Sequence, residues 1–380
     1  MKIEKGKIDI WILMPVLILL IFSIGAVYSA SSSFASDEFS DSSYLFKQHA
    51  IRVVISLFCI FLFAKIDYRY LQDISKPLMW LSIIMLLYIF IGGQTTVKGA
   101  ARWIFIGPLS FQPSDLAKFT LLIYLSALLV RKKEYTWMLY RGYLPILFYL
   151  LLVTALVALQ PNFSTSLIIF GTGILLLLNS NVKLKHIFYT IVALIPFGIV
   201  FVLSKAYIIG RLTSHAEYTG GGDSNYQLYQ AIIGFGNGGL FGIGPGNSLQ
   251  REFFLPEAHG DFIYSVIGEE YGFLGTMAIL LLFMIIMYRG FKVSKEIKDD
   301  FGKYVAFGIT AVITAYAVIN MFVSTGIAPT TGVPMPFISY GGTAMIINSI
   351  AIGVLLNISS FRNEPEATFD EAPRGEELNI

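Results

Sequence analysis

The stretch DFIYSVIGEEYGFLGTMAILLLFMIIMY, residues 261–288, decides the fold. Its apolar run over 262–288 is long enough to cross a bilayer as a helix. Asp261 lies at the start of this run, and Glu269 and Glu270 lie inside it. Ionisable side chains at membrane depth are costly, so they face a bundle interior or mark a site that handles a polar group. The stretch predicts a helix of a membrane bundle with a candidate site at its beginning, and at least one of the two glutamates paired inside the bundle.

Apolar runs of this kind recur along the whole chain of 380 residues, which is 55% hydrophobic and only 14% charged. This composition excludes a soluble globular protein and indicates a polytopic membrane protein. The runs cover about 9–30, 48–66, 76–93, 114–131, 142–160, 163–180, 186–207, 262–288, 304–325 and 341–359. We therefore predict an all-α fold of ten transmembrane helices. They form a single domain over 1–361, and the polar, acidic segment 362–380 is a disordered cytoplasmic tail.

The distribution of Lys and Arg predicts the orientation, because basic residues concentrate in cytoplasmic loops. Most of the 27 basic residues face the cytoplasm if the N-terminus lies inside, including those in the segments 131–141 and 289–303. An even number of helices then places both termini in the cytoplasm. The first run is too long for the apolar part of a signal peptide and is interpreted as a retained helix. The net charge of +2 gives no support for nucleic-acid binding, and the single cysteine, Cys59, excludes an internal disulfide and a cysteine-built metal site.

Three connections on the predicted outer side are long, namely 31–47, 94–113 and 208–261. The first is rich in Ser and acidic residues, and we expect a solvated loop without chemistry. The third is a large extracytoplasmic loop between helices seven and eight. Its many glycines favour tight turns and close backbone approach over regular helix.

Basic residues are rare on the outer side of a membrane protein, so those found there are expected to bind something outside the protein. For Lys98 and Arg102 a phosphate group is the natural ligand, because Lys and Arg bind phosphoryl oxygens strongly. The alternative, weighed equally, is that both extend to lipid headgroups as interface anchors. Arg211, Gln227 and Gln230 in the long loop offer hydrogen bonds to sugar hydroxyls and amides, a weak signal because polar loop residues are ordinary.

Asp115 and Lys118 lie three residues apart at the start of a predicted helix, on one helical face. An isolated Lys in lipid would be costly, so we expect the two side chains to pair. Pairing alone is a structural role. The more specific hypothesis is that the pair lines a polar cavity.

Two roles are open for Asp261. As an N-cap it would only begin the helix; as a carboxylate in a partly dehydrated outer cavity it could act as a general base. His259 supports this site or is an ordinary loop residue, and no Cys/His ligand set indicates a transition metal. The Pro- and Gly-rich segment 329–342 lies between the last two predicted helices. Non-helical backbone at membrane depth is tolerated only where it lies against protein or lines a watery cavity. We therefore expect Ser339 and Tyr340 to face the same cavity as Asp261.

Five motifs together resemble the SEDS family (FtsW, RodA and the sporulation homologue), which are membrane peptidoglycan glycosyltransferases with ten helices. In family order they are KGAARWI (98–104), FQPSDLAKF (111–119), YQLYQAIIGFGNGGLFGIGPGNS (226–248), FFLPEAHGDFIYSVIGEEYGFLG (253–275) and TGVPMPFISYGG (331–342). The resemblance covers about residues 10–360.

The resemblance implies polymerisation of lipid II, the undecaprenyl-pyrophosphate-linked disaccharide, at the outer face of the bacterial cytoplasmic membrane. The family's essential Asp matches Asp261, which would deprotonate the acceptor hydroxyl. Asp115 and Lys118 match the family's acidic–basic pair, and Arg102 matches a basic residue near it. No cofactor is implied with certainty, and a divalent cation is left open. The predicted substrate-binding residues are Lys98, Arg102, Gln112, Asp115, Lys118, Arg211, Gln227, Gln230, Glu257, His259 and Ser339.

Some positions depart from the family pattern: Asp115 stands where Glu is usual, and Gly260 where Thr is usual. The GPGNS and GEEYG runs are more similar to the division-specific FtsW branch than to RodA. That branch implies a septal location, a class B penicillin-binding protein (a transpeptidase) as partner, and contact with other divisome proteins. The alternatives are an elongation polymerase of the RodA type, a flippase for lipid-linked precursors and, more weakly, a scaffold. A flippase needs a polar pathway to the inner side, whereas the notable polar residues lie on the outer half, which favours the enzyme.

Overall fold

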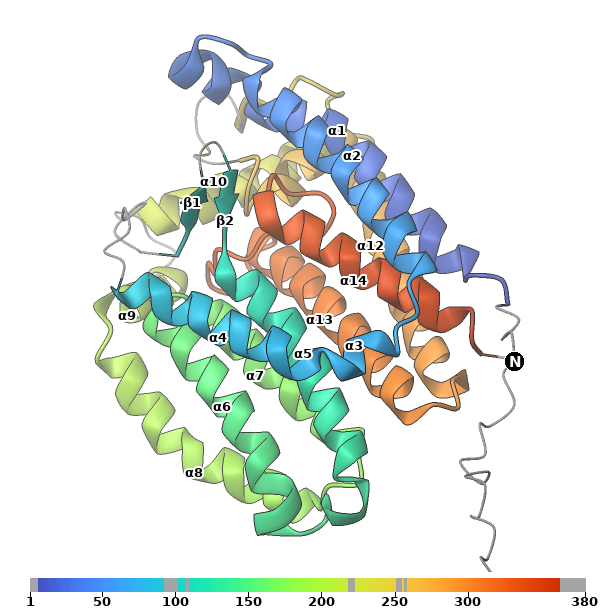
Figure 1. Ribbon diagram of the computed structural model, residues 1–380. Helices are drawn as coiled ribbons and strands as arrows, with labels where there is room; N and C mark the ends of the chain where they lie inside the picture. Colours follow the sequence, from blue (N-terminus) through green and yellow to red (C-terminus); the bar gives the residue numbers. More distant parts are fainter. Residues whose placement is uncertain are drawn as a thin grey trace, which may run out of the picture.

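The computed structural model describes residues 6–91, 102–106, 109–217, 223–250, 255 and 258–362. Helices dominate this part of the chain (Figure 1). They are α1 (Ile10–Phe39), α2 (Tyr44–Lys65), α3 (Tyr70–Asp73), α4 (Ser75–Ile91), α5 (Pro113–Arg131), α6 (Leu144–Leu159), α7 (Phe163–Leu178), α8 (Leu184–Leu203), α9 (Ala206–Glu217), α10 (Asp223–Gly238), α12 (Ile263–Glu296), α13 (Asp300–Ser324) and α14 (Gly342–Ser359). Short 3-10 and π turns, Lys133–Tyr135 and Leu139–Tyr143, precede α6. One antiparallel hairpin joins β1 (Ile104–Ile106) and β2 (Leu109–Phe111), with Ile104 opposite Phe111.

The helical membrane fold is confirmed. Within the described ranges, eight helices are long and apolar enough to cross a membrane: α1, α2, α5, α6 with the turn before it, α8, α12, α13 and α14. Two shorter apolar helices, over Ser75–Phe90 and Phe163–Leu178, coincide with the two remaining predicted runs. The number of spans, the single domain and the orientation remain predictions, and the tail beyond Arg362 lies outside the described residues.

The centre of the bundle is formed by α5, α13 and α14, whose residues are mostly buried (Figure 1). Helix α14 packs along α2, and Gly353 allows the close approach, since a Cβ there would lie 2.8 Å from the carbonyl oxygen of Ile60. Helix α8 lies at the periphery and buries only Ile187. The hairpin, α9 and α10 lie at the end of the bundle away from the N-terminus.

The prediction of a solvated loop over 31–47 is wrong for most of its length, because α1 continues to Phe39. Two buried serines, one at the start of this region and one just before it, have partners within the protein. Ser31 is fully buried and donates to the carbonyl of Val27 at 2.7 Å, and the Ser29 hydroxyl donates to the carboxylate of Glu270. Ser hydroxyls can satisfy themselves on their own helix in this way, so a Ser-rich segment need not be a loop.

For 208–261 the sequence predicts close backbone approach and no regular helix, and the second part of this prediction is wrong. Regular helix is present, since α9 extends into this segment and α10 lies within it. The expected close backbone approach is confirmed: a Cβ at Gly238 would overlap the carbonyl oxygen of Gly268, and one at Gly242 would overlap that of Glu270. The glycines therefore permit a tight contact between α10 and α12 instead of breaking α10.

Glu269 binds this outer segment to α12. Its carboxylate is fully buried and accepts hydrogen bonds from Asn237 Nδ2 at 3.1 Å, from the backbone N–H of Gln250 at 3.3 Å and from the Ser248 hydroxyl. With Glu270 bound by Ser29, both glutamates are satisfied inside the bundle, as the sequence predicts.

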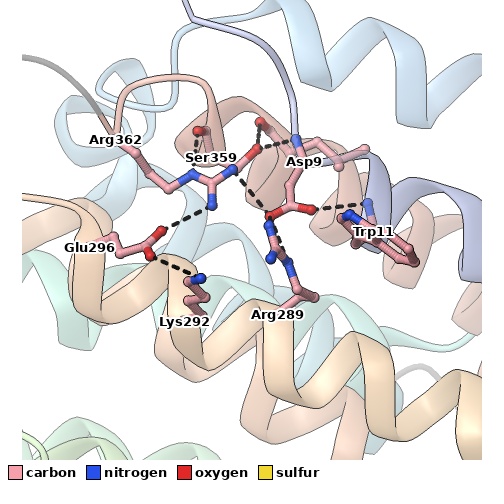
Figure 2. Close-up of polar contacts among 8 residues, drawn as sticks. Asp9, Trp11, Arg289, Lys292, Glu296, Ser359 and Arg362 are labelled. Atoms are coloured by element: carbon pink, nitrogen blue, oxygen red, sulfur yellow. Dashed lines mark hydrogen bonds and ion pairs between the residues drawn. The ribbon is translucent and has the colours of Figure 1, made fainter.

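At the other end of the molecule, a buried cluster around Asp9 joins three helices (Figure 2). Asp9 Oδ2 accepts from Arg289 Nη2 at 2.5 Å on α12 and from Arg362 Nη2 at 3.1 Å just after α14, and the Asp9 side chain is 0% exposed. Arg362 Nη1 also pairs with Glu296 at 3.0 Å, and the backbone N–H of Asp9 donates to Ser359 Oγ at 2.9 Å. The start of α1 and the ends of α12 and α14 are thereby fixed to one another.

We predict that Asp9→Asn lowers the free energy of unfolding by about 3 kcal/mol, because it leaves two guanidinium groups without their buried counter-ion. The measurement is thermal or denaturant unfolding of purified protein in detergent. Glu296→Gln, at the exposed rim of the same cluster, is the control, with an expected loss below about 1 kcal/mol. Equal losses for the two variants would contradict the assignment of Asp9 as the centre of the cluster.

Candidate functional site

Asp261 is held through its backbone carbonyl, just before α12 begins. Helix α12 begins at Ile263 with Phe262 as N-cap, so the N-cap alternative for Asp261 is wrong. The carbonyl oxygen of Asp261 accepts from Asn320 Nδ2 at 2.8 Å, and the same amide group donates to the carbonyl of Val333 at 2.8 Å. Asn320 is 1% exposed. It therefore joins the segment before α12 to the segment before α14.

The interrupted segment between α13 and α14 forms a cradle for residues 259–261. Ser339 Oγ donates to the carbonyl of Gly260 at 2.8 Å and accepts from the N–H of Met335 at 2.8 Å. The N–H of Tyr340 donates to the carbonyl of His259 at 2.9 Å. The carboxylate of Asp261 lies against Gly332, where Oδ2 is 3.5 Å from the position of an added Cβ. The structure thus brings His259, Ser339 and Asp261 together.

Two arginines lie on the other side of the carboxylate. Arg102 donates to the carbonyl of Pro161, and Arg211 Nη1 donates to the carbonyl of Thr331 at 3.4 Å. Burial lowers the pKa of Arg102, and the positive charge of Arg211 lowers it further, while Tyr207 and Asp261 raise it. Arg102 stays protonated in any case. Two cations beside one carboxylate form a site suited to a multiply charged anion such as a diphosphate.

A cavity of about 560 Å³ lies beside these groups. Mainly apolar side chains of α7, α8, α9 and α13 line it, together with residues 329–331. Its polar lining includes Tyr207, Arg211 and Thr331. Thr331 lines the cavity and the next residue, Gly332, lies against Asp261, so the cavity ends next to the segment that contacts the carboxylate.

The predicted ion pair of Asp115 and Lys118 is confirmed. The two side chains are 7% and 3% exposed, and Lys118 Nζ lies 2.9 Å from Asp115 Oδ1. Lys118 also lies 4.2 Å from the centre of the Tyr316 ring. Tyr316 and Asn320 are four residues apart on α13, so the pair lies about 6 Å deeper along that helix than the contact with Asp261. Asp115 Oδ2 is buried, and none of the residues described here donates to it.

For the other predicted residues, the structure shows no direct contact with Asp261 among the described contacts. The backbone N–H of Gln112 donates to Thr343 Oγ1 at 2.9 Å, which joins the start of α5 to α14. Gln227 and Gln230 are half-buried on α10. Lys98 and Glu257 lie outside the described residues. Across the described ranges, no group of three His, Cys, Asp or Glu side chains could hold a metal ion.

Sequence reasoning missed Asn320, Tyr316 and Tyr207. Asn320 and Tyr316 stand in the apolar run 304–325, and a polar side chain inside such a run was the available signal. Tyr207 had no signal of its own.

A family model described as a cell cycle protein, FtsW/RodA/SpoVE, matches residues 10–364. The chain belongs to this family. It is 35% identical to the "Probable peptidoglycan glycosyltransferase FtsW" of Geobacter metallireducens, over 94% of this chain and 96% of the relative. It is 34% identical to Stage V sporulation protein E of Bacillus subtilis, over 95% of this chain and 99% of the relative. The resemblance to the SEDS family is therefore confirmed.

The fold is also similar to solved structures of the family. RodA of Thermus thermophilus matches with a TM-score of 0.68 at 22% identity, over 94% of this chain and 98% of that chain. A chain from a study of a peptidoglycan synthase complex, on the coordination of polymerization and crosslinking, matches with a TM-score of 0.76 at 23% identity. That match covers 94% of this chain and 99% of the other.

We predict that Asp115→Asn destabilises the protein by about 3 kcal/mol, because it leaves the buried Lys118 without its counter-ion. The double variant Asp115→Asn/Lys118→Met removes both charges and should recover most of the loss. Unfolding of the three proteins in detergent measures both effects. A double variant no more stable than the single one would contradict the pairing as the cause.

Proposed function

We propose that this chain is a membrane peptidoglycan glycosyltransferase that polymerises lipid II at the outer face of the cytoplasmic membrane during cell division. The observation that carries the proposal is the continuity of three features. Arg211 lines the apolar cavity and donates to the carbonyl of Thr331, and the next residue, Gly332, lies against the carboxylate of Asp261. A lipid-linked sugar has the same three parts in the same order.

Each part of the substrate has a matching part of the site. The apolar cavity accepts a segment of the polyprenyl chain, because its mainly apolar lining matches the apolar surface of that chain and keeps it away from water. Arg102 and Arg211 bind the pyrophosphate through charge-assisted hydrogen bonds. The sugar next to the pyrophosphate then lies beside Asp261.

The reaction follows from this placement. Asp261 accepts the proton of the acceptor sugar's hydroxyl as that oxygen attacks the anomeric carbon of the donor. The new glycosidic bond forms, and the bond from the anomeric carbon to the phosphate oxygen breaks. The lipid pyrophosphate leaves with the electron pair, and Arg102 and Arg211 stabilise the charge that develops on it.

We place the protein at the division septum, with a class B penicillin-binding protein as partner and other divisome proteins nearby. FtsW relatives at about one-third identity support division, and likeness to a chain studied in a synthase complex supports a partner. A cognate transpeptidase is the partner expected of a polymerase whose product must be crosslinked.

The test of the function is polymerisation of lipid II by purified protein in proteoliposomes with its cognate transpeptidase. Asp261→Asn should lower the rate by about 10²- to 10⁴-fold, the usual contribution of a general base. Asp41→Asn, an exposed carboxylate after α1, is the matched control and should polymerise like wild type. Equal polymer from wild type and Asp261→Asn would overturn the role of Asp261. Lipid translocation without polymer from either would favour a transporter.

Asn320→Leu should lower kcat about tenfold, because it releases the backbone of Asp261 from Val333 and the base loses its position. Asn357→Leu is the matched control: Asn357 is also fully buried and bridges the Tyr68 N–H and the Ala64 carbonyl, away from the site. Both variants should lose thermal stability in detergent, but only Asn320→Leu should lower kcat per folded molecule. Equal kcat values for the two variants would assign Asn320 to stability alone.

A further inference from the structure

Arg52 on α2 is a charged side chain that the proposed reaction does not use. It is half-buried, and its Nη2 donates to Gln48 Oε1 at 3.2 Å. Its Nη1 is buried, and no group in the described part of the chain accepts from it. None of the described carboxylates forms an ion pair with it. A guanidinium at membrane depth normally has such a partner, so the charge of Arg52 calls for an anion from outside the protein.

The start of α14 faces the same guanidinium. A Cβ added to Gly342, the first residue of α14, would lie 3.8 Å from Arg52 Cζ. Gly341 is the N-cap and supplies no side-chain cap. The first N–H groups of this 18-residue helix therefore carry a partial positive charge next to Arg52. Gln48 accepts from both Arg52 and the Tyr340 hydroxyl, at 2.7 Å from the latter, and so fixes the direction of the guanidinium.

The ring of Tyr340 separates Arg52 from the Asp261 segment. Arg52 Cζ lies 4.6 Å from the centre of this ring, and the His259 ring lies 5.4 Å from it. Arg102 lies elsewhere: the charged groups that act on it are Arg211, Tyr207 and Asp261. Residues 259–261 therefore have one cationic site on the α9 side, next to the carboxylate, and a second on the α2 side, one aromatic ring away.

We propose that Arg52 and the start of α14 bind the pyrophosphate of the acceptor lipid II, while Arg102 and Arg211 bind that of the donor. This inference rests on the proposed polymerase function. Polymerisation joins two lipid-linked substrates, and each carries a pyrophosphate. The donor's pyrophosphate is attached to the reacting carbon and must lie beside Asp261. The acceptor's pyrophosphate is separated from the attacking hydroxyl by its own sugars, so it requires a second cationic site farther from the base.

The competing interpretation is that Arg52 only fastens α2 to the Tyr340 segment. The contact with the Tyr340 ring and the hydrogen bond to Gln48 serve that purpose. In a purely structural role, substitution of Arg52 would change thermal stability but not how the rate depends on the concentration of each substrate. Binding of the acceptor's pyrophosphate would change the dependence on the acceptor alone.

The experiment supplies the two substrates separately to full-length protein with its cognate transpeptidase in proteoliposomes. A lipid-linked tetrasaccharide serves as the donor and lipid II as the acceptor. Arg52→Gln should raise the half-saturating concentration of acceptor lipid II about tenfold, the loss of one charge-assisted contact. The half-saturating concentration of donor should stay within about twofold of wild type. Arg52→Lys, which keeps the charge, should restore most of the acceptor affinity.

Lys47→Gln is the matched control, since it removes an exposed positive charge from the same helix and should change neither value. Unchanged acceptor dependence in Arg52→Gln, or a change in donor dependence alone, would overturn the inference. If Arg52→Gln does not fold, Arg52→Met, which keeps the apolar length of the side chain and removes the charge, decides: wild-type acceptor dependence together with lowered thermal stability would leave Arg52 a purely structural residue. Failure of wild type to polymerise would instead refute the proposed function.

Discussion

A backbone that leaves the helix at membrane depth must find its hydrogen bonds within the protein, and the segment between α13 and α14 obeys this constraint. Its carbonyl and N–H groups are satisfied by Asn320, Ser339 and the backbone of His259. The same contacts hold residues 259–261, because Asn320 and Ser339 each bind a carbonyl there. The side chains that satisfy the non-helical backbone between α13 and α14 therefore also fix the backbone of Asp261.

The buried charges divide into two groups. Asp9, Glu269 and the Asp115–Lys118 pair have partners within the bundle, and they hold helices together. The cations around residues 259–261 are different, because none of the described carboxylates forms an ion pair with Arg52, and Arg102 donates to the neutral carbonyl of Pro161. Charge left without a counter-ion is costly in a membrane, so its concentration around residues 259–261 fits a site that receives an anionic substrate.

Local periodicity predicted much of this structure. Membrane-length apolar runs located the helices, and the spacing of three residues predicted the pair of Asp115 and Lys118. Composition was a poorer guide: Ser-rich residues extend α1, where Ser31 donates to a carbonyl of its own helix, and glycines stand inside α10, where Gly238 allows close contact with α12. The two hydrogen bonds of Asn320 could not be predicted from the sequence. They join Asn320 to Asp261 and Val333, which are 59 and 13 positions away in the chain and come together only in the folded bundle.

Asp115 and Gly260, two of the positions that depart from the family pattern, differ in their consequences. The shorter side chain of Asp115 still reaches Lys118, since the two share a helical face and Oδ1 lies 2.9 Å from Lys118 Nζ. The other oxygen of Asp115, Oδ2, has no donor among the described residues and remains able to accept a hydrogen bond from a substrate hydroxyl or water. Gly260 contributes through its carbonyl, which Ser339 binds, so the contact that fixes it does not need a side chain. With no side-chain hydroxyl at Gly260, Asn320 and Ser339 hold this part of the backbone through the carbonyl groups of Asp261 and Gly260.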